Sequence, residues 1–399
     1  MDEIKIQEIV GPIAGEDEVE LVERKGLGHP DTICDLVMER ISQALWREYR
    51  RQCGRVLHYN CDKGLLVAGQ VERRFGGGRV IKPMRLVIGD RATIVKEFDV
   101  AQVAAASARG WFRENLPEVD ERHLELQVEL RGGSEELTGI FREPQTIAVA
   151  NDTSATVGYA PLTETERLVL EAESFLNSVK FKISHPETGS DVKVMALRVG
   201  NQVTFTVAMP LLDNMVANED DYFRRKEETR QALISYLRSR LDKMRDVAVA
   251  INTLDRREAG LSGIYLSVLG TSAEDADSGE VGRGNQVNGV IALNRPRGSE
   301  AAAGKNPVSH VGKIYNVLSH LLARRIDHEV PGLREVILWL CSRIGDPIDK
   351  PQVAAVQVKL EEGIHMTQVA DPIRRIVARE FTQLPSFCQA LAEGKYPIC

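Results

Sequence analysis

The chain has 399 residues, a hydrophobic content of 43% and a formal net charge of −7 at pH 7. This length predicts about two to four structural units, and the apolar content suffices for a sizeable core. The acidic balance with dispersed basic residues argues against nucleic-acid binding, and no apolar run approaches the ~18–20 residues of a membrane span. The N-terminus lacks a signal-peptide core and the six cysteines form no Cys-x-x-Cys pair, so we expect a cytoplasmic protein.

The first strongly patterned segment is GLGHPD at 26–31, followed at once by an amphipathic run over 32–53. Glycines let backbone approach a ligand closely, and a helix N-terminus favours anions. His29 can act on a leaving oxygen, and Asp31 can bind a hard cation such as Mg²⁺. These features suit a polyphosphate with its metal. Pro30 and Asp31 would equally suit an ordinary helix start, and both interpretations stay open here.

Two later segments show the same order of glycine, proline and amphipathic run. The segment at 158–161 leads into 162–178, and the segment at 304–307 leads into 308–326. If this similarity is not chance, it indicates a threefold repeat of α+β units, each a sheet covered by helices. We place the three units at 1–145, 146–260 and 261–399, with approximate boundaries and with discontinuous domains allowed.

The remaining pattern predicts further elements between these helices. A hairpin is expected over 192–198 and 202–208, around Gly200 and Asn201. The other predicted elements are a charged helix at 219–244, strands at 247–251, 264–268, 336–340 and 353–360, and a last helix at 373–391. Loops are expected at 76–78, 132–134 and 273–284, the last being acidic and glycine-rich and therefore either a surface loop or part of a site.

Lys305 lies in a segment, 298–306, that nearly matches a P-loop. A P-loop has four residues between its glycines and Ser or Thr after the Lys. Here five residues separate the glycines and Asn306 follows, which argues against a P-loop NTPase. Lys305 precedes a predicted helix and could meet phosphate there, although a solvated Lys in a polar turn is the alternative.

Three more charged residues are candidates for ligand contact. Lys193 interrupts an apolar strand and could bind phosphate or simply face solvent. Arg283 stands between two glycines that clear space around its guanidinium group. Asp152 follows the apolar run 147–150, which predicts a strand. A carboxylate at a strand end can bind a ribose, a cation or an amino group, or form an Asx-turn. No Ser-His-Asp order and no zinc-ligand spacing is visible.

Together these motifs resemble the S-adenosylmethionine synthetases (methionine adenosyltransferases), in particular their archaeal-type branch. The segments that carry the resemblance occur in family order over roughly 20–320. They are VERKGLGHPD (22–31), ANDTS (150–154), GYAPL (158–162), GTSAE (270–274), VGRGN (281–285) and GKNPVSHVGK (304–313).

The resemblance implies an enzyme that forms S-adenosylmethionine from ATP and L-methionine. Sulfur attacks C5′ in line, and the released triphosphate is hydrolysed to pyrophosphate and phosphate. The implied fold is three pseudo-repeated α+β domains. The implied cofactors are Mg²⁺, as two ions, and K⁺. The implied assembly is a homodimer whose active sites are shared between subunits, or a higher oligomer, with no nucleic-acid or membrane partner.

The motif match also implies roles for individual residues. His29 would lie at the leaving oxygen and the phosphates, and Asp31 would bind Mg²⁺. Lys193, Arg283 and Lys305 would hold the triphosphate and act in catalysis with His29. The remaining implied contacts are Glu23, Asp152 and Asp277 around methionine and adenosine, with Asp277 also on ATP, and Gly132, Gly133 and Ser134 at a lid over ATP.

The chain departs from the family pattern at several positions. Thr32 follows His-Pro-Asp where bacterial and eukaryotic members have Lys, and Arg131 stands where the lid segment has its first Gly, so the Gln of Gly-Gln-Gly-Ser is missing. A second Mg²⁺ ligand and a late phosphate-binding Lys have no clean equivalent among Ser309, His310, Gly312 and Lys313.

Two other functions were weighed against this one. A kinase would transfer the γ-phosphoryl group, need a base near a substrate hydroxyl and leave ADP. A catalytically silent nucleotide-binding subunit would have little reason to keep the charged set, which is His29, Asp31, Lys193, Arg283 and Lys305.

Overall fold

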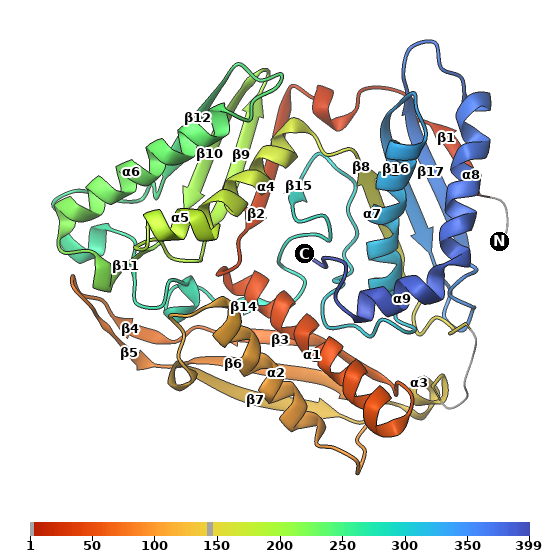
Figure 1. The fold of residues 1–399 in the computed structure, drawn as a ribbon, viewed down its shortest axis with the longest axis horizontal. Helices are drawn as coiled ribbons and strands as arrows, with labels where there is room; N and C mark the ends of the chain where they lie inside the picture. The colour runs from red at the N-terminus through yellow and green to blue at the C-terminus, as the bar shows by residue number, and fades with distance from the viewer. Residues whose placement is uncertain (1–3, 142–146) are drawn as a thin grey trace.

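The computed structural model describes residues 4–141 and 147–399. Three larger sheets, each covered on one face by helices, surround a central region of loops that also holds the C-terminus (Figure 1). This arrangement confirms the predicted α+β class. Among the described residues, no helix is both long and apolar enough to cross a membrane.

The first unit is built around helix α1 (Pro30–Cys53), which begins at Pro30 as predicted. Ile33, Val37 and Ile41 share one face of α1 and are fully buried, because that face packs on β3. Helix α2 (Val100–Asn115) packs on α1 and β7. The sheet order is β14-β3-β6-β7. Its strands are β3 (Tyr59–Val67), β6 (Met84–Ala92), β7 (Leu124–Arg131) and β14 (Gly279–Glu280), with the small β4 (Gln70–Glu72) and β5 (Arg79–Lys82) pair beside them.

The second unit contains the predicted hairpin, now seen as β9 (Lys193–Val199) and β10 (Gln202–Ala208) in antiparallel register. Its sheet order is β12-β10-β9-β2-β15. The other strands are β2 (Val19–Lys25), β12 (Asp246–Ile251) and β15 (Ile291–Ala292), and the helices are α4 (Glu164–Leu176), α5 (Val179–Ser184) and α6 (Glu219–Arg238).

The third unit has the sheet order β1-β17-β16-β8. Its elements are β1 (Lys5–Glu8), β8 (Ala155–Ala160), β16 (Leu333–Cys341), β17 (Val353–Leu360), α7 (Val311–Glu329), α8 (Met366–Thr382) and α9 (Leu384–Ala392). The single helix predicted at 373–391 is wrong, because the chain forms two helices that meet at Gln383. Pro385 lies in the first turn of α9, where a missing N–H is tolerated, and it could not continue α8.

Two strand predictions also fail. The predicted strand at 264–268 shrinks to β13 (Leu266–Ser267), which pairs with β11 (Leu211–Leu212). The run 147–150 forms only an isolated bridge between Val149 and Pro347. Both runs lack a neighbouring strand of matching length, and a strand needs such a partner for its backbone groups.

The three helix starts are less alike than the sequence suggested. Pro30 lies in the first turn of α1, whereas α4 begins at Glu164 after an N-cap at Thr163, and α7 begins only at Val311. The delay before α7 has a local cause. Asn306 Oδ1 accepts hydrogen bonds from the N–H groups of residues 308 and 309 and holds a turn there.

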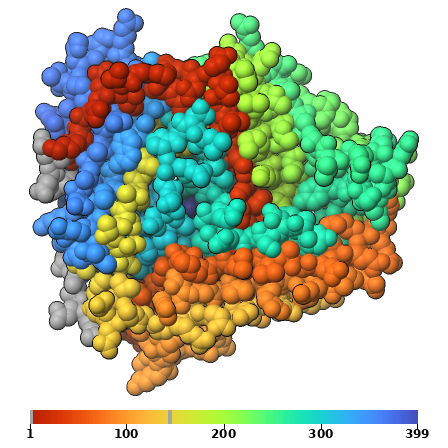
Figure 2. All heavy atoms as spheres, turned by 180° about the vertical axis from the view of Figure 1, so that it is seen from behind, coloured from red at the N-terminus to blue at the C-terminus, as the bar shows by residue number. Residues whose placement is uncertain are grey.

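Strand pairing interleaves the chain among the three units. The N-terminal strands β1 and β2 join the third and second sheets, and β14 and β15 join the first and second. The domain boundaries 1–145, 146–260 and 261–399 stay a prediction. The strand pairing shows that β1, β2, β14 and β15 each belong to a sheet outside the predicted unit in which they occur. In β3 and β9 exposed residues alternate with buried ones, and Leu65, Leu197 and Val199 are on the exposed faces of these strands. Figure 2 shows the molecule from behind, with the chain near residues 280–305 in the centre between the three units.

Candidate active site

The segment before α1 is held against the strand that carries Lys193. Gly26 N–H donates to the Val192 carbonyl at 2.7 Å, and Gly28 N–H donates to the Ser190 carbonyl at 3.0 Å. A methyl group at residue 28 would lie 2.5 Å from the backbone nitrogen of Asp191. The glycines therefore permit a close packing of two backbone segments, and this packing places His29 at the end of β9.

His29 is the N-cap residue of α1 and is buried. Its Nδ1 accepts a hydrogen bond from Asp31 N–H at 3.2 Å, so the ring proton belongs on Nε2. Burial lowers the pKa of His29 to about 4, an effect that the charges of Lys25 and Lys193 reinforce and that of Asp31 opposes. At neutral pH the ring is an uncharged donor through Nε2.

The Asp31 carboxylate bonds to groups outside α1 and does not cap that helix. Oδ1 accepts from Glu280 N–H in β14 at 3.0 Å, and Oδ2 lies 2.8 Å from the Lys25 ammonium. That ammonium also donates to the Arg283 carbonyl at 2.5 Å. Asp31 therefore pairs with the Lys25 ammonium group at the point where β2, α1 and the 281–285 loop meet.

Lys193 and three carboxylates lie beside this point. Lys193 is half-exposed, pairs with Lys25 in the β2–β9 register, and has its Nζ 3.4 Å from Glu23 Oε1. Asp191 accepts from Ser272 N–H at 2.8 Å, and burial raises the pKa of Asp191 to about 6, with the charge of Asp277 adding to the shift. Asp277 is held beside Asp191, because its N–H donates to the carbonyl of the same Ser272 at 2.9 Å.

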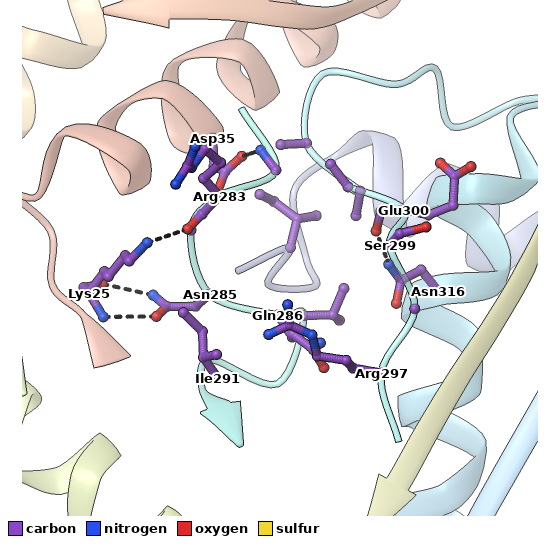
Figure 3. A pocket seen from close by; sticks show the side chains of 18 of the residues that line it. Lys25, Asp35, Arg283, Asn285, Gln286, Ile291, Arg297, Ser299, Glu300 and Asn316 are labelled. Carbon is purple, nitrogen blue, oxygen red and sulfur yellow. Dashed lines mark hydrogen bonds between the residues drawn. The ribbon is translucent and has the colours of Figure 1, made fainter. Parts of the chain in front are cut away.

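Arg283 completes this first group. Asp35, one turn after Asp31, accepts from Gly282 N–H at 2.8 Å, and burial raises the pKa of Asp35 to about 7. Figure 3 shows the Arg283 side chain beside Asp35 at the edge of a cavity of about 510 Å³. The predicted residues that the structure brings together here are Glu23, His29, Asp31, Lys193, Asp277 and Arg283.

Lys305 belongs to a different group. Its Nζ lies 2.6 Å from Asp62 Oδ2 and 3.4 Å from Glu300 Oε2, and the residue is 4% exposed. The alternative of a solvated Lys is therefore wrong. Its carbonyl accepts from Ser42 Oγ at 2.8 Å, and the neighbouring Gly304 carbonyl accepts from Cys61 N–H, so α1 and β3 fix this segment.

The lid segment is hydrogen-bonded to the end of the first sheet, and Asp152 lies beside the segment that follows Lys305. The Gly132 carbonyl accepts from Arg91 at the end of the first sheet, and Ser134 Oγ caps the short helix α3 (Glu135–Gly139). Asp152 Oδ1 accepts from Thr153 N–H at 2.7 Å, and the N–H of the residue before it donates to the Ser309 carbonyl. Asp152 precedes β8 instead of ending a strand, as the sequence had suggested.

The two groups contact different turns of α1. Its first turn carries Asp31, whereas Ser42 and Glu39 contact the Lys305 segment and Lys313. The eight residues from Asp31 to Glu39 span ~12 Å of helix. One chain therefore presents two partial sites, one around His29 and one around Lys305.

Several site residues had no role in the sequence analysis. Asp35 and Glu39 follow Asp31 at four-residue intervals on α1, and all three carboxylates are buried. Acidic residues that recur every four positions along one side of a predicted helix were a usable signal. Asp62 and Lys25 carried no comparable signal, because their partners are distant in sequence.

Comparison with known proteins gives a consistent result along the whole chain. The family model for S-adenosylmethionine synthetase (AdoMet synthetase) matches residues 2–395. S-adenosylmethionine synthases from Natronomonas pharaonis and Aeropyrum pernix are 42% and 46% identical, over 98% and 90% of both chains. A solved structure of an unusual S-adenosylmethionine synthetase from Campylobacter jejuni has a TM-score of 0.61 at 14% identity, covering 92% of this chain and 88% of that one, which shows a shared fold.

Proposed function

The chain belongs to the S-adenosylmethionine synthetase family, and on that premise we propose that it forms S-adenosyl-L-methionine from ATP and L-methionine. The methionine sulfur attacks C5′ of ATP in line, the C5′–O bond breaks, and the triphosphate leaves with that bonding pair. Water then splits the triphosphate into pyrophosphate and phosphate. The observation that carries the proposal is the gathering of His29, Lys193, Arg283 and Lys305 at two partial sites in a chain of net charge −7.

These residues supply what the leaving group needs. Negative charge grows on the C5′ oxygen as the bond breaks, and donors already aimed at that oxygen stabilise it without reorganisation. The uncharged His29 ring donates there through Nε2. Lys193, Arg283 and Lys305 neutralise the triphosphate. Because the two substrates must be aligned for in-line attack, the rigid backbone around 26–28 contributes by fixing His29.

The carboxylates fit the other half of the reaction. The product sulfonium and the methionine ammonium are cations, so negative side chains stabilise them. Glu23 and Asp277 would serve this role in the His29 group, and Asp152 would serve it from the Lys305 group.

The residues present also fit a divalent metal. The described residues contain no cluster of three or more His, Cys, Asp or Glu side chains that could hold a metal. Mg²⁺ commonly takes only one or two protein carboxylates and fills its shell with phosphate and water. Asp31, which already pairs with the Lys25 ammonium, would hold it, and bound Mg²⁺ would neutralise triphosphate charge. Two Mg²⁺ ions and a need for K⁺ stay predictions for metal titration.

The two partial sites also support a homodimer. A two-fold axis would bring the His29 group of one chain against the Lys305 group of its partner, and so form two equivalent sites. The exposed faces of β3 and β9 offer a surface for this contact, because Leu65, Leu197 and Val199 are exposed there. Assembly beyond the dimer stays a prediction.

Product identification tests the reaction. The protein is incubated with ATP, methionine and Mg²⁺, and nucleotides and phosphates are separated. We expect S-adenosylmethionine, pyrophosphate and phosphate. ADP as the methionine-dependent product would refute the proposal and favour a kinase.

Asp31→Asn tests the metal site. Asn keeps an oxygen acceptor for the Glu280 N–H but loses the charge, so we expect turnover to fall by orders of magnitude. Because the neutral Asn leaves the largely buried Lys25 ammonium without its carboxylate, the folded state should lose about 3–5 kcal/mol, whereas Asp31→Ala as a mere cap loss would cost only about 0.5–2 kcal/mol. Near-normal turnover in a folded Asp31→Asn protein would leave Asp31 a structural role alone.

A further inference from the structure

The His310 side chain, at the N-terminus of α7, is buried without a partner for Nδ1. His310 is 6% exposed, and within 4–141 and 147–399 nothing forms a hydrogen bond with its Nδ1. The ring does not cap the helix. A methyl group at residue 312 would lie 3.2 Å from this Nδ1, so the ring lies over the first turn of α7. A buried polar atom without a partner is costly, which points to a partner that binds there.

The first turn of α7 itself offers donors. The His310 carbonyl accepts the N–H groups of Lys313 and Ile314, so those of Val311 and Gly312 have no acceptor within the helix. Unpaired N–H groups and the helix dipole favour an anion at this end.

Two buried ammonium groups flank the ring. Lys305 is 4% exposed and pairs with Asp62, and Lys313 is 1% exposed and pairs with Glu39 at 2.6 Å. Burial, reinforced by the charges of these two lysines and opposed by that of Asp62, lowers the pKa of His310 to about 3. An uncharged imidazole can donate a hydrogen bond without adding a third buried positive charge. The two ammonium groups and the uncharged imidazole therefore disfavour a metal ion and favour an oxyanion.

A carboxylate already lies at this position. Glu300 Oε2 is 3.4 Å from the Lys305 ammonium, and a methyl group at residue 312 would lie 2.8 Å from the same oxygen. The Glu300 main chain is fixed, because its carbonyl accepts from Asn316 Nδ2 at 2.8 Å (Figure 3). Its side chain is 29% exposed, so the carboxylate can swing away while the backbone stays in place.

We propose that His310, Lys305 and the first turn of α7 form an oxyanion site for a terminal phosphoryl group of a polyphosphate. Glu300 occupies this site in the free protein and is displaced when the polyphosphate binds. The identification of the polyphosphate as triphosphate rests on the proposed function. His310 is thereby a phosphate-binding residue, and Glu300 is a competitor for the same donors.

Calorimetric titration of the full-length protein with inorganic tripolyphosphate tests the site. His310→Leu removes the donor, and Gly312→Ala places a methyl group in the site, so each should weaken binding by about tenfold or more, the scale of one charge-assisted hydrogen bond. Glu300→Gln removes the competing charge and should strengthen binding several-fold. A structural role for these residues would not produce effects of opposite sign.

Two matched variants control for indirect effects. Gly110→Ala adds a methyl group to a helix at a position whose nearest neighbouring atom lies 4.0 Å away, so it isolates helix propensity. His320→Leu removes the other buried α7 histidine with an unpaired Nδ1. Both should leave tripolyphosphate affinity unchanged, and thermal unfolding identifies any variant that does not fold. If His310→Leu does not fold, Gly312→Ala carries the test.

The outcomes separate this inference from the proposed function. Unchanged affinity in folded His310→Leu or Gly312→Ala protein overturns the phosphate site, even if the wild type makes S-adenosylmethionine. Weaker binding in Glu300→Gln overturns the displacement. If the variants behave as expected but the wild type makes no S-adenosylmethionine, the oxyanion site stands and the proposed function fails.

Discussion

Mixed dimers give the sharpest test of how the two partial sites combine. His29 and Lys305 lie in separate groups of one chain, on opposite sides of the span of α1 between Asp31 and Glu39. If each active site takes one group from each chain, His29→Ala and Lys305→Ala homodimers are both damaged at every site and should be nearly inactive. In a mixed dimer one site collects both lesions and the other collects none.

The expected activity follows from this geometry. Co-expression with two different affinity tags and tandem purification isolates the mixed dimers, which should have about half the wild-type rate of S-adenosylmethionine formation per dimer. An unfractionated, randomly paired mixture should have about a quarter, because only about half of its dimers are mixed.

A matched control dimer should give the opposite result. In a dimer of wild type with the double variant His29→Ala/Lys305→Ala, every shared site carries one lesion, so this dimer should be nearly inactive. If sites lay within single chains, it would keep about half the wild-type rate, and the mixed dimers of single variants would recover nothing. That pair of results would refute the shared-site reasoning.

Two further predictions concern stability. Gly133→Ala should cost about 1–3 kcal/mol in urea unfolding, because the new methyl group would lie 2.6 Å from His58 Nδ1. Gly132→Ala, with no atom within 4 Å of the added methyl group, should stay within about 0.5 kcal/mol of wild type; equal losses in the two variants would contradict this packing. Burial lowers the pKa of His320 to about 4, so between pH 6.5 and 4 the unfolded chain binds a proton that the folded chain does not. The free energy of unfolding therefore falls with falling pH in this window, and His320→Gln should flatten that slope by up to about 1.4 kcal/mol per pH unit, whereas an unchanged slope would show that the buried ring is not neutral.

The sequence alone predicted features that depend on neighbouring residues. Pro30 and the apolar spacing after it predicted the start and the buried face of α1, and the alternation around Gly200 predicted the β9–β10 hairpin. The ordered motifs between 22 and 313 identified the family. These predictions succeed because helix capping, turn conformation and side-chain period are set within a few residues.

Predictions from local sequence patterns failed where contacts with other segments determine the secondary structure. The chain divides 373–391 into two helices, and it delays α7 to Val311 because Asn306 holds a turn. Residues 147–150 form no strand because no strand pairs with them along their length.

Only the tertiary structure decided which candidate residues meet. Lys25, Asp31 and Arg283 converge because β2, α1 and the 281–285 loop pack together, and Lys305 pairs with Asp62 across 243 residues of sequence. It also placed His29 and Lys305 in separate groups and left His310 Nδ1 without a partner. Such contacts depend on sheet pairing between segments far apart in the chain, and residue spacing within one segment carries no information about them.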